Sequence, residues 1–272
     1  MHNRIDDCFA RLRKKKGKGF IPYICAGDPS LERTRELGLA LEKAGADLLE
    51  LGLPFSDPLA DGVVNQLAAQ RALAAGTTIP GVFDCVREIR LKCQIPIVLY
   101  SYLNPIFQFG ADRFHREAEA AGVDGLLILD LPPEEEAVEL DWLNQSSSSA
   151  PTHIRLIAPT TPPERIKKIA QSAKGFIYYV SREGVTGARD SIASSLQEKI
   201  AELKKHSDLP IAVGFGISSP DQARDVAQYA DAVVVGSAIV DLVAKYGDSS
   251  QMVEKVGAFA KEIAKSLKSL NR

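Results

Sequence analysis

The sequence predicts an α/β fold, a (β/α)8 TIM barrel with an extra N-terminal helix. Eight short apolar runs of strand type alternate with amphipathic segments of helical length over the 272 residues. Near-continuous apolar strands separated by helices are typical of a parallel sheet whose outer face the helices cover. A closed barrel of this kind usually has about 250 residues, so one barrel accounts for almost the whole chain.

The predicted strands are rich in Ile, Val and Leu and lie at residues 20–26, 47–51, 97–101, 125–130, 153–158, 176–180, 211–214 and 232–235. Helical patterns lie at residues 31–43, 78–90, 112–121, 134–144, 163–173, 194–205, 220–228 and 250–267. A weak repeat supports this alternation, because Ala-Gly-x-Asp leads into the second and the fourth strand. Gly45 and Gly122 of the repeat are predicted to end helices in the left-handed conformation.

The chain is predicted to be a single domain over residues 1–272, because no break in composition and no long linker divides it. The barrel is expected over about residues 20–245, followed by a C-terminal helix over residues 246–272. The serine run at residues 146–149 is expected to be a flexible surface loop.

The extra helix is expected over residues 1–19. Ile5, Phe9 and Leu12 fall on one face of it at helical spacing, so we expect this face to close the bottom of the barrel. Its basic run predicts a solvated helix end or, alternatively, a contact with a polyanion.

Composition and charge favour a small molecule as the ligand. Lys and Arg number 33 against 35 Asp and Glu, and the net charge of -2 argues against nucleic acid or an anionic membrane as the partner. No apolar run reaches the length of about 18 residues typical of a membrane span. Basic residues occupy the stretch where a signal peptide would be apolar, so we expect a cytoplasmic protein.

Cysteine and histidine spacing predicts neither a metal site nor a disulfide. Cys8, Cys25, Cys85 and Cys93 form no C-x-x-C pair, and the four histidines form no H-E-x-x-H motif. We expect buried free thiols, because Cys behaves as a small hydrophobic residue when nothing activates it.

Polar residues at the carboxyl ends of the predicted strands are the candidates for chemistry, because active sites of such barrels lie there. Glu50 ends a leucine-rich strand, where desolvation is expected to raise its pKa toward that of a proton-transfer catalyst. The alternative for Glu50 is a structural ion pair. Asp61 follows in a loop with Pro and Gly, either as a second functional carboxylate or as a cap of its own turn.

Glycine-containing turns predict a phosphate site. Residues 181–189 follow the sixth strand and contain glycines, arginines and a threonine, which suit an anion-binding loop or, alternatively, a plain surface loop. Gly214 and Gly216 follow the seventh strand, and Gly236 and Ser237 follow the eighth, directly before a helix start. Two such turns on consecutive strands predict a substrate that carries a phosphate.

A longer run and several shorter motifs carry a resemblance to a known family. Residues 50–62, Glu-Leu-Gly-Leu-Pro-Phe-Ser-Asp-Pro-Leu-Ala-Asp-Gly, resemble the signature of the tryptophan synthase α subunit family. Further matches follow the family's order at residues 20–23, 26–29, 130–132, 158–162, 181–187 and 214–218. Together they cover about residues 20–240.

The resemblance implies retro-aldol cleavage of indole-3-glycerol phosphate to indole and glyceraldehyde 3-phosphate, a lyase reaction of tryptophan biosynthesis. It implies no cofactor in this subunit and, as partner, a pyridoxal-phosphate β subunit that receives the indole in an αββα tetramer. Glu50 matches the general acid and base, and Asp61 matches the carboxylate that engages the indole N–H. The matching substrate-binding residues are Tyr23, Tyr100, Tyr178, Thr186, Gly187, Gly216, Gly236 and Ser237.

Two features depart from the family pattern. The family usually has a proline after Asp61-Gly62, whereas this chain has Val63-Val64-Asn65-Gln66, which we expect to loosen the loop that carries Asp61. Tyr100 stands where the family often has an aliphatic residue, so the indole pocket is expected to differ in shape. Two other hypotheses stay open: another phosphosugar enzyme on the same barrel, and a non-catalytic allosteric subunit that binds phosphate ligands.

Overall fold

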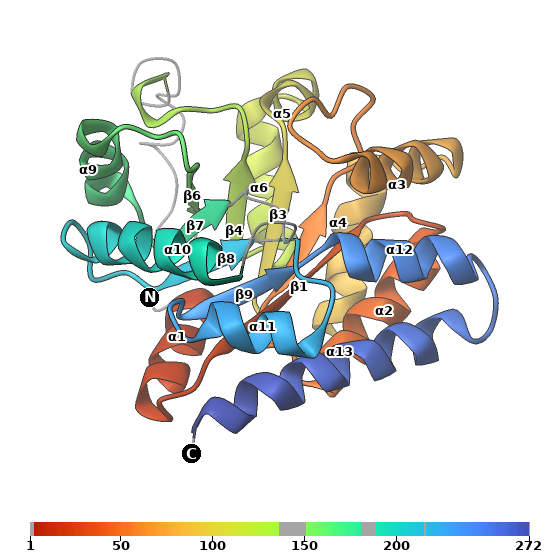
Figure 1. Cartoon of the computed structure of the whole chain (residues 1–272). Coiled ribbons are helices and arrows are strands. Elements are labelled where there is room, and N and C mark those ends of the chain that lie inside the picture. The colour runs from red at the N-terminus through yellow and green to blue at the C-terminus, as the bar shows by residue number, and fades with distance from the viewer. Residues whose placement is uncertain (1–2, 136–150, 181–188, 215, 272) are drawn as a thin grey trace.

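Parallel strands form a ring at the centre of the molecule, and helices lie outside it (Figure 1). The computed structural model describes residues 3–135, 151–180, 189–214 and 216–271. The strands are β1 (Gly19–Cys25), β2 (Leu49–Gly52), β3 (Ile97–Ser101), β4 (Gly125–Ile128), β5 (Thr152–His153), β6 (Arg155–Ile157), β7 (Ile177–Val180), β8 (Ile211–Gly214) and β9 (Ala232–Val235).

The ring closes through one strand that is divided in two. The strand order is β5-β4-β3-β2-β1-β9-β8-β7-β6, with β5 and β6 at its two ends. Only Ile154 separates β5 from β6 along the chain, and β5 pairs with β4 while β6 pairs with β7, both in parallel. The predicted fifth strand is therefore a single barrel strand whose halves face different neighbours. The predicted α/β barrel is confirmed.

The helices are α1 (Arg4–Lys14), α2 (Leu31–Ala44), α3 (Val63–Ala74), α4 (Ile79–Arg90), α5 (Leu103–Phe109), α6 (Ala111–Ala121), α9 (Pro163–Ser172), α10 (Arg189–Lys204), α11 (Pro220–Ala227), α12 (Ser237–Tyr246) and α13 (Met252–Lys268), with a final 3-10 turn at Ser269–Asn271. Most of the predicted helices are confirmed close to their expected bounds. Residues 136–144 of one predicted helix and the serine run at 146–149 lie outside the described residues.

Helices α3 and α5 are absent from the predicted elements, and each has a local reason. The buried face of α3 consists of Ala68, Ala69 and Ala72, so it lacks the stripe of large apolar side chains that marks an amphipathic helix. Helix α5 has seven residues and contains Pro105 in its first turn. Both helices follow strands of the barrel at the end where the predicted site lies.

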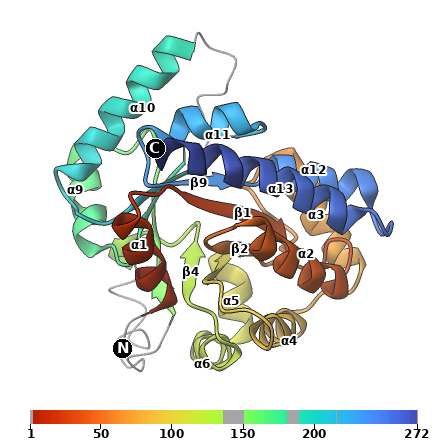
Figure 2. The same ribbon diagram turned by 90° about the horizontal axis from the view of Figure 1, so that it is seen from below.

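Helix α1 closes the lower end of the barrel, as predicted (Figure 2). It is shorter than the expected 1–19, because it ends at Lys14, a few residues before β1. Ile5 and Phe9 pack into the core inside the ring, and the rings of Phe9 and Phe176 lie 5.5 Å apart. The helix thus seals the ring at the end opposite to the predicted site.

Capping residues explain where two of the outer helices begin and end. Ser30 accepts a hydrogen bond from the backbone N–H of Arg33 and so begins α2. Gly45 and Gly122 end α2 and α6 with φ values of 107° and 90°. These are the left-handed conformations that the repeat predicts.

The described residues include no helix that could span a membrane and no cluster of metal-binding side chains. None of their helices is long and apolar enough to cross a bilayer. In the same ranges, no three or more His, Cys, Asp or Glu side chains gather in a way that could hold a metal ion. The four cysteines are buried, as predicted.

Candidate active site

A cavity of about 1100 Å³ opens at the carboxyl ends of the strands, and the loop between β2 and α3 forms part of its wall. It is lined by the predicted site residues Tyr23, Glu50, Asp61, Tyr100, Tyr178, Gly216, Gly236 and Ser237. The other two, Thr186 and Gly187, lie outside the described residues. The closed ring therefore brings residues from both ends of the chain to one site.

Glu50 lies on β2 between Tyr23 of β1 and Val98 of β3 in the strand register. Its side chain lines the cavity and is only 2% exposed. Burial raises the pKa of Glu50 to about 8, with a further contribution from the charge of Asp61, while a hydrogen bond with Tyr178 acts in the opposite direction. No Lys or Arg of the described residues contributes to this pKa shift. This argues against the alternative that Glu50 forms a structural ion pair.

Asp61 lies in the loop after β2, and two tyrosines hold its carboxylate. The Tyr100 hydroxyl donates to Oδ1 at 2.8 Å, and the Tyr102 hydroxyl donates to Oδ2 at 2.9 Å. These bonds turn the carboxylate toward the cavity side of β3, which argues against a cap of its own turn. Tyr102 was missed by the sequence reasoning, although a tyrosine two residues after Tyr100 falls on the same face of a strand.

The loop that carries Asp61 is also anchored to α3. Gln66 Nε2 donates to the backbone carbonyl of Asp61 at 2.9 Å, and the backbone N–H of Ala60 donates to the Tyr102 hydroxyl at 3.0 Å. These bonds tie the backbone of Ala60 and Asp61 to neighbouring side chains. The expected loosening of the loop stays a prediction.

Aromatic rings form the walls around the two carboxyl groups. The rings of Tyr23 and Tyr100 lie 5.2 Å apart in an edge-to-face arrangement, and Tyr178 lines the cavity from β7. Gly52 and Gly214 make room for these rings, since a Cβ at Gly214 would lie 2.9 Å from the Tyr178 hydroxyl and one at Gly52 still closer to that of Tyr23. Burial raises the pKa of all three tyrosines well above the ordinary value, so they remain hydrogen-bond donors.

The phosphate prediction falls on the start of α12. Gly236 is the N-cap of this helix, and no side chain caps it. The first backbone N–H groups of a helix have no partner within the helix and carry partial positive charge, so they suit an anion. Gly236, Ser237 and Gly216 all line the cavity. This is the arrangement that phosphate-binding barrels use after their last strands.

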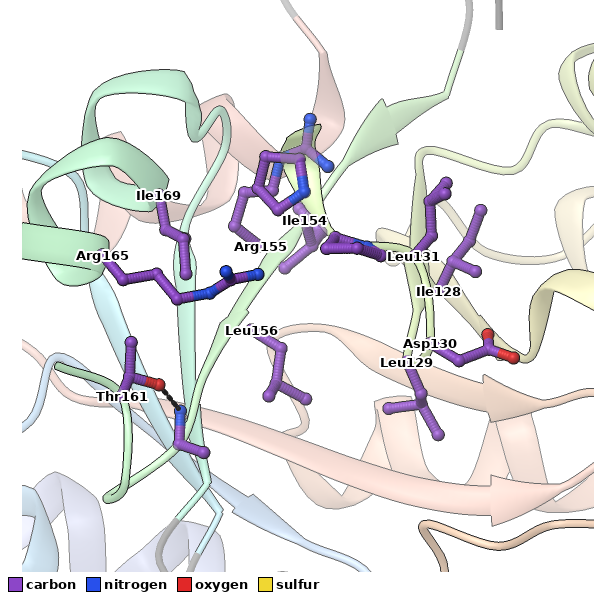
Figure 3. Close-up of a pocket in the computed structure, with 13 residues that line it drawn as sticks. Ile128, Leu129, Asp130, Leu131, Ile154, Arg155, Leu156, Thr161, Arg165 and Ile169 are labelled. Atoms are coloured by element: carbon purple, nitrogen blue, oxygen red, sulfur yellow. Dashed lines mark hydrogen bonds between the residues drawn. The ribbon is translucent and has the colours of Figure 1, made fainter. Parts of the chain in front are cut away.

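A second cavity of about 210 Å³ lies between the loop after β4 and helix α9 (Figure 3). Its polar side chains serve contacts within the fold. Arg165 contacts Glu134 at 3.2 Å, and Thr161 accepts the backbone N–H of Ala158 at 3.1 Å. Asp130, which points away from Arg165 in Figure 3, accepts the first N–H of α5 at 2.7 Å. The larger cavity remains the candidate active site.

The chain is similar in sequence to known proteins over nearly its whole length. The sequence model of the family described as tryptophan synthase alpha chain matches residues 9–268. The chain is 54% identical over 237 residues to the tryptophan synthase alpha chain of Geotalea daltonii, which covers 87% of this chain and 89% of that protein. It is 47% identical over 271 residues to that of Opitutus terrae, covering 98% of this chain and 99% of that protein.

Solved structures share the fold as well. Tryptophan synthase subunit alpha from Legionella pneumophila superposes with a TM-score of 0.88 at 38% identity, over 99% of this chain and 100% of that one. A chain of tryptophan synthase from M. tuberculosis superposes with a TM-score of 0.86 at 31% identity, over 98% of this chain and 99% of that one. Sequence and fold together show that the chain belongs to the tryptophan synthase α-chain family.

Proposed function

We propose that the large cavity binds indole-3-glycerol phosphate and that Glu50 and Asp61 carry out the family's lyase reaction, which yields indole and glyceraldehyde 3-phosphate. One observation carries the assignment of the acid. Glu50 is a buried carboxyl group with a pKa raised to about 8, on the wall of a cavity that also presents the Asp61 carboxylate. A group with this pKa holds its proton at neutral pH and can still release it.

Glu50 acts first as an acid and then as a base. Its proton goes to the indole ring carbon that bears the glycerol chain, which makes the ring an electron acceptor. The Glu50 carboxylate then takes the proton of the adjacent glycerol hydroxyl group, whose oxygen becomes the aldehyde oxygen. The electrons of the breaking C–C bond return to the ring and release indole. Glu50 ends the cycle protonated, so no other proton donor is consumed.

Asp61 serves the opposite edge of the indole ring. Positive charge develops at the ring nitrogen when the ring carbon is protonated, and a fixed carboxylate that accepts the N–H stabilises it. The hydrogen bonds from Tyr100 and Tyr102 hold the Asp61 carboxylate in place. Tyr23 and Tyr178 supply aromatic surface beside the ring.

The phosphate of the substrate binds to the free N–H groups at Gly236 and Ser237, with Gly216 approaching from the turn after β8. Thr186 and Gly187 belong to the same proposal on the resemblance alone.

Indole release by the purified chain tests this proposal directly. We expect indole from indole-3-glycerol phosphate without added metal or cofactor, and a loss of most of the rate in Asp61→Asn because the charge at the ring nitrogen is lost. Affinity for inorganic phosphate should be unchanged in Asp61→Asn, since the phosphate contacts lie on α12. Absence of indole from a folded wild-type chain, with or without a β subunit, would contradict the function.

The partner is proposed to be a pyridoxal-phosphate β subunit in a cytoplasmic αββα assembly, with no cofactor in this chain. Exposed apolar side chains at the upper end of the molecule supply a docking surface. Leu59, Val63 and Leu67 of the β2–α3 loop and α3 are 90%, 69% and 47% exposed, and Phe107 of α5 is 71% exposed. Apolar side chains gathered beside a site suit a protein partner.

A charged substitution on this surface tests the docking of the β subunit. Leu59→Asp should weaken the binding of the β subunit at least about tenfold, because it buries a carboxylate in an apolar interface. Leu91→Asp is the matched control, since Leu91 is 85% exposed but follows α4 at the lower end. Sedimentation of each variant with the β subunit measures the effect and the stoichiometry. Equal binding by the two variants would contradict this surface.

A further inference from the structure

Two tyrosines from the end of one strand hold the carboxylate of Asp61. Tyr100 is the second-last residue of β3, and Tyr102 follows that strand directly, so both side chains point to the same side. Tyr100 donates to Oδ1 at 2.8 Å and Tyr102 to Oδ2 at 2.9 Å. Each carboxylate oxygen therefore has its own phenolic donor.

The two donors differ in what else they contact. The Tyr102 hydroxyl also accepts the backbone N–H of Ala60, so it ties down the loop as well as the carboxylate. The Tyr100 hydroxyl is hydrogen-bonded to the Asp61 side chain, and its ring packs edge-on against Tyr23 at 5.2 Å. Tyr100 thus acts on the orientation of the carboxylate, whereas Tyr102 acts on loop and carboxylate together.

Asp61 Oδ1 has a second side-chain donor, and this hydrogen bond is longer than that from Tyr100. Asn65 of α3 brings its Nδ2 to 3.5 Å from the same Oδ1, which is too long for a strong hydrogen bond. Its own Oδ1 is buried without a hydrogen-bond partner in the described part of the chain. Tyr100 therefore makes the short hydrogen bond to Asp61 Oδ1, as Tyr102 does to Oδ2.

We propose that Tyr100 is a positioning residue, which holds the Asp61 carboxylate in the orientation that stabilises the charged indole ring. This inference rests on the proposed role of Asp61. A carboxylate held before the substrate arrives costs no reorganisation during the reaction, so its benefit appears in the chemical step and not in substrate binding.

Tyr100→Phe tests the inference because it removes only the hydroxyl group. We expect kcat for indole formation to fall about tenfold and KM for indole-3-glycerol phosphate to stay within about twofold, as for one lost hydrogen bond to a charged group. Tyr246→Phe, at the far end of α12, is the matched control and should leave both constants unchanged. Tyr100→Leu is the second variant and should lose at least as much in kcat.

A double-mutant cycle separates positioning from a direct or structural role. If Tyr100 acts through Asp61, Tyr100→Phe should change kcat less than about twofold in the Asp61→Asn background. An undiminished effect in that background, a rise in KM with constant kcat, or full activity of Tyr100→Phe would overturn the inference. Full activity of Asp61→Asn would instead overturn the proposed role of Asp61, so the two failures are distinguishable.

Discussion

Buried carboxyl groups at the two ends of the barrel have opposite electrostatic surroundings. At the lower end, Asp124 is 5% exposed, and Arg90 and Arg4 contact its two oxygens at 2.6 and 2.9 Å. The backbone N–H of Ile97 donates to it as well, at 2.8 Å. At the upper end, Glu50 is equally buried, but the described groups that determine its pKa include no cation.

The charges around a buried carboxyl group decide whether it contributes to stability or is suited to proton transfer. A buried carboxylate with cations and a backbone donor around it is satisfied, and removal of one member leaves a charge without compensation. A buried carboxyl group without a cation is pushed toward its protonated form and can exchange a proton near neutral pH. Asp124 thus stabilises the lower end of the barrel, whereas Glu50 at the upper end is suited to exchange a proton.

Removal of the acidic group of Glu50 should have the largest effect on activity. In Glu50→Gln, we expect indole formation to fall at least about 1000-fold, because the group that protonates the ring is gone. The free energy of unfolding should stay the same or increase, since an amide replaces a buried group that is costly to ionise. Indole assays and denaturant unfolding measure the two. Activity within tenfold of the wild type would refute the assignment of Glu50.

Asp124→Ala should give the reverse pattern. We expect the free energy of unfolding to fall by about 3 kcal/mol, because Arg90 is left buried without its carboxylate, while kcat stays unchanged. Asp248→Ala is the control, since that carboxylate is 77% exposed in its pair with Arg33 and should cost less than about 1 kcal/mol. Equal losses in the two variants would break the comparison.

A histidine pair near the lower half should make the fold sensitive to acid. His115 Nδ1 donates to the Ala111 carbonyl at 2.9 Å, so its Nε2 accepts from His153 Nε2 at 3.1 Å. Burial lowers the pKa of each from 6.5 to about 4, and Lys174 adds to the effect on His153.

The unfolded chain therefore binds more protons than the folded chain between pH 6.5 and about 4, and stability falls as the pH falls through this window. We expect a loss of a few kcal/mol, since a shift of one pKa unit corresponds to about 1.4 kcal/mol. Urea unfolding at several pH values measures it, and His153→Phe should reduce the slope. A slope that His153→Phe leaves unchanged would show that other groups cause the acid sensitivity.

The enzymatic activity, in contrast, should be lost at alkaline pH. The reaction needs Glu50 protonated, and its pKa is about 8, so kcat/KM should fall about tenfold for each pH unit above 8. The Tyr178 hydrogen bond lowers this pKa, so Tyr178→Phe should move the break to higher pH. A flat profile between pH 7 and 9, or a break that moves to lower pH in Tyr178→Phe, would contradict this account.

Much of the candidate site could be predicted because its parts are local in the chain. Glu50 is marked by a carboxylate inside a leucine run, and Gly236 by a turn between a strand and a helix start. The motif at residues 50–62 then identified the family, and Asp61 with it. Tyr102 was not predicted, because its partner is 41 residues away and only strand pairing brings them together.

The sequence by itself determined the strands, most helices and the closing role of Ile5 and Phe9, because each depends on neighbours within a few residues. It also predicted the acid at Glu50 and the phosphate turns from local patterns of the same kind. Only the tertiary structure decided that the fifth strand splits at Ile154, that α3 and α5 are helices, and that Tyr100 and Tyr102 divide the oxygens of Asp61. It also decided which buried carboxylate has cations around it. These outcomes rest on contacts between distant parts of the chain, which exist only once the ring has closed.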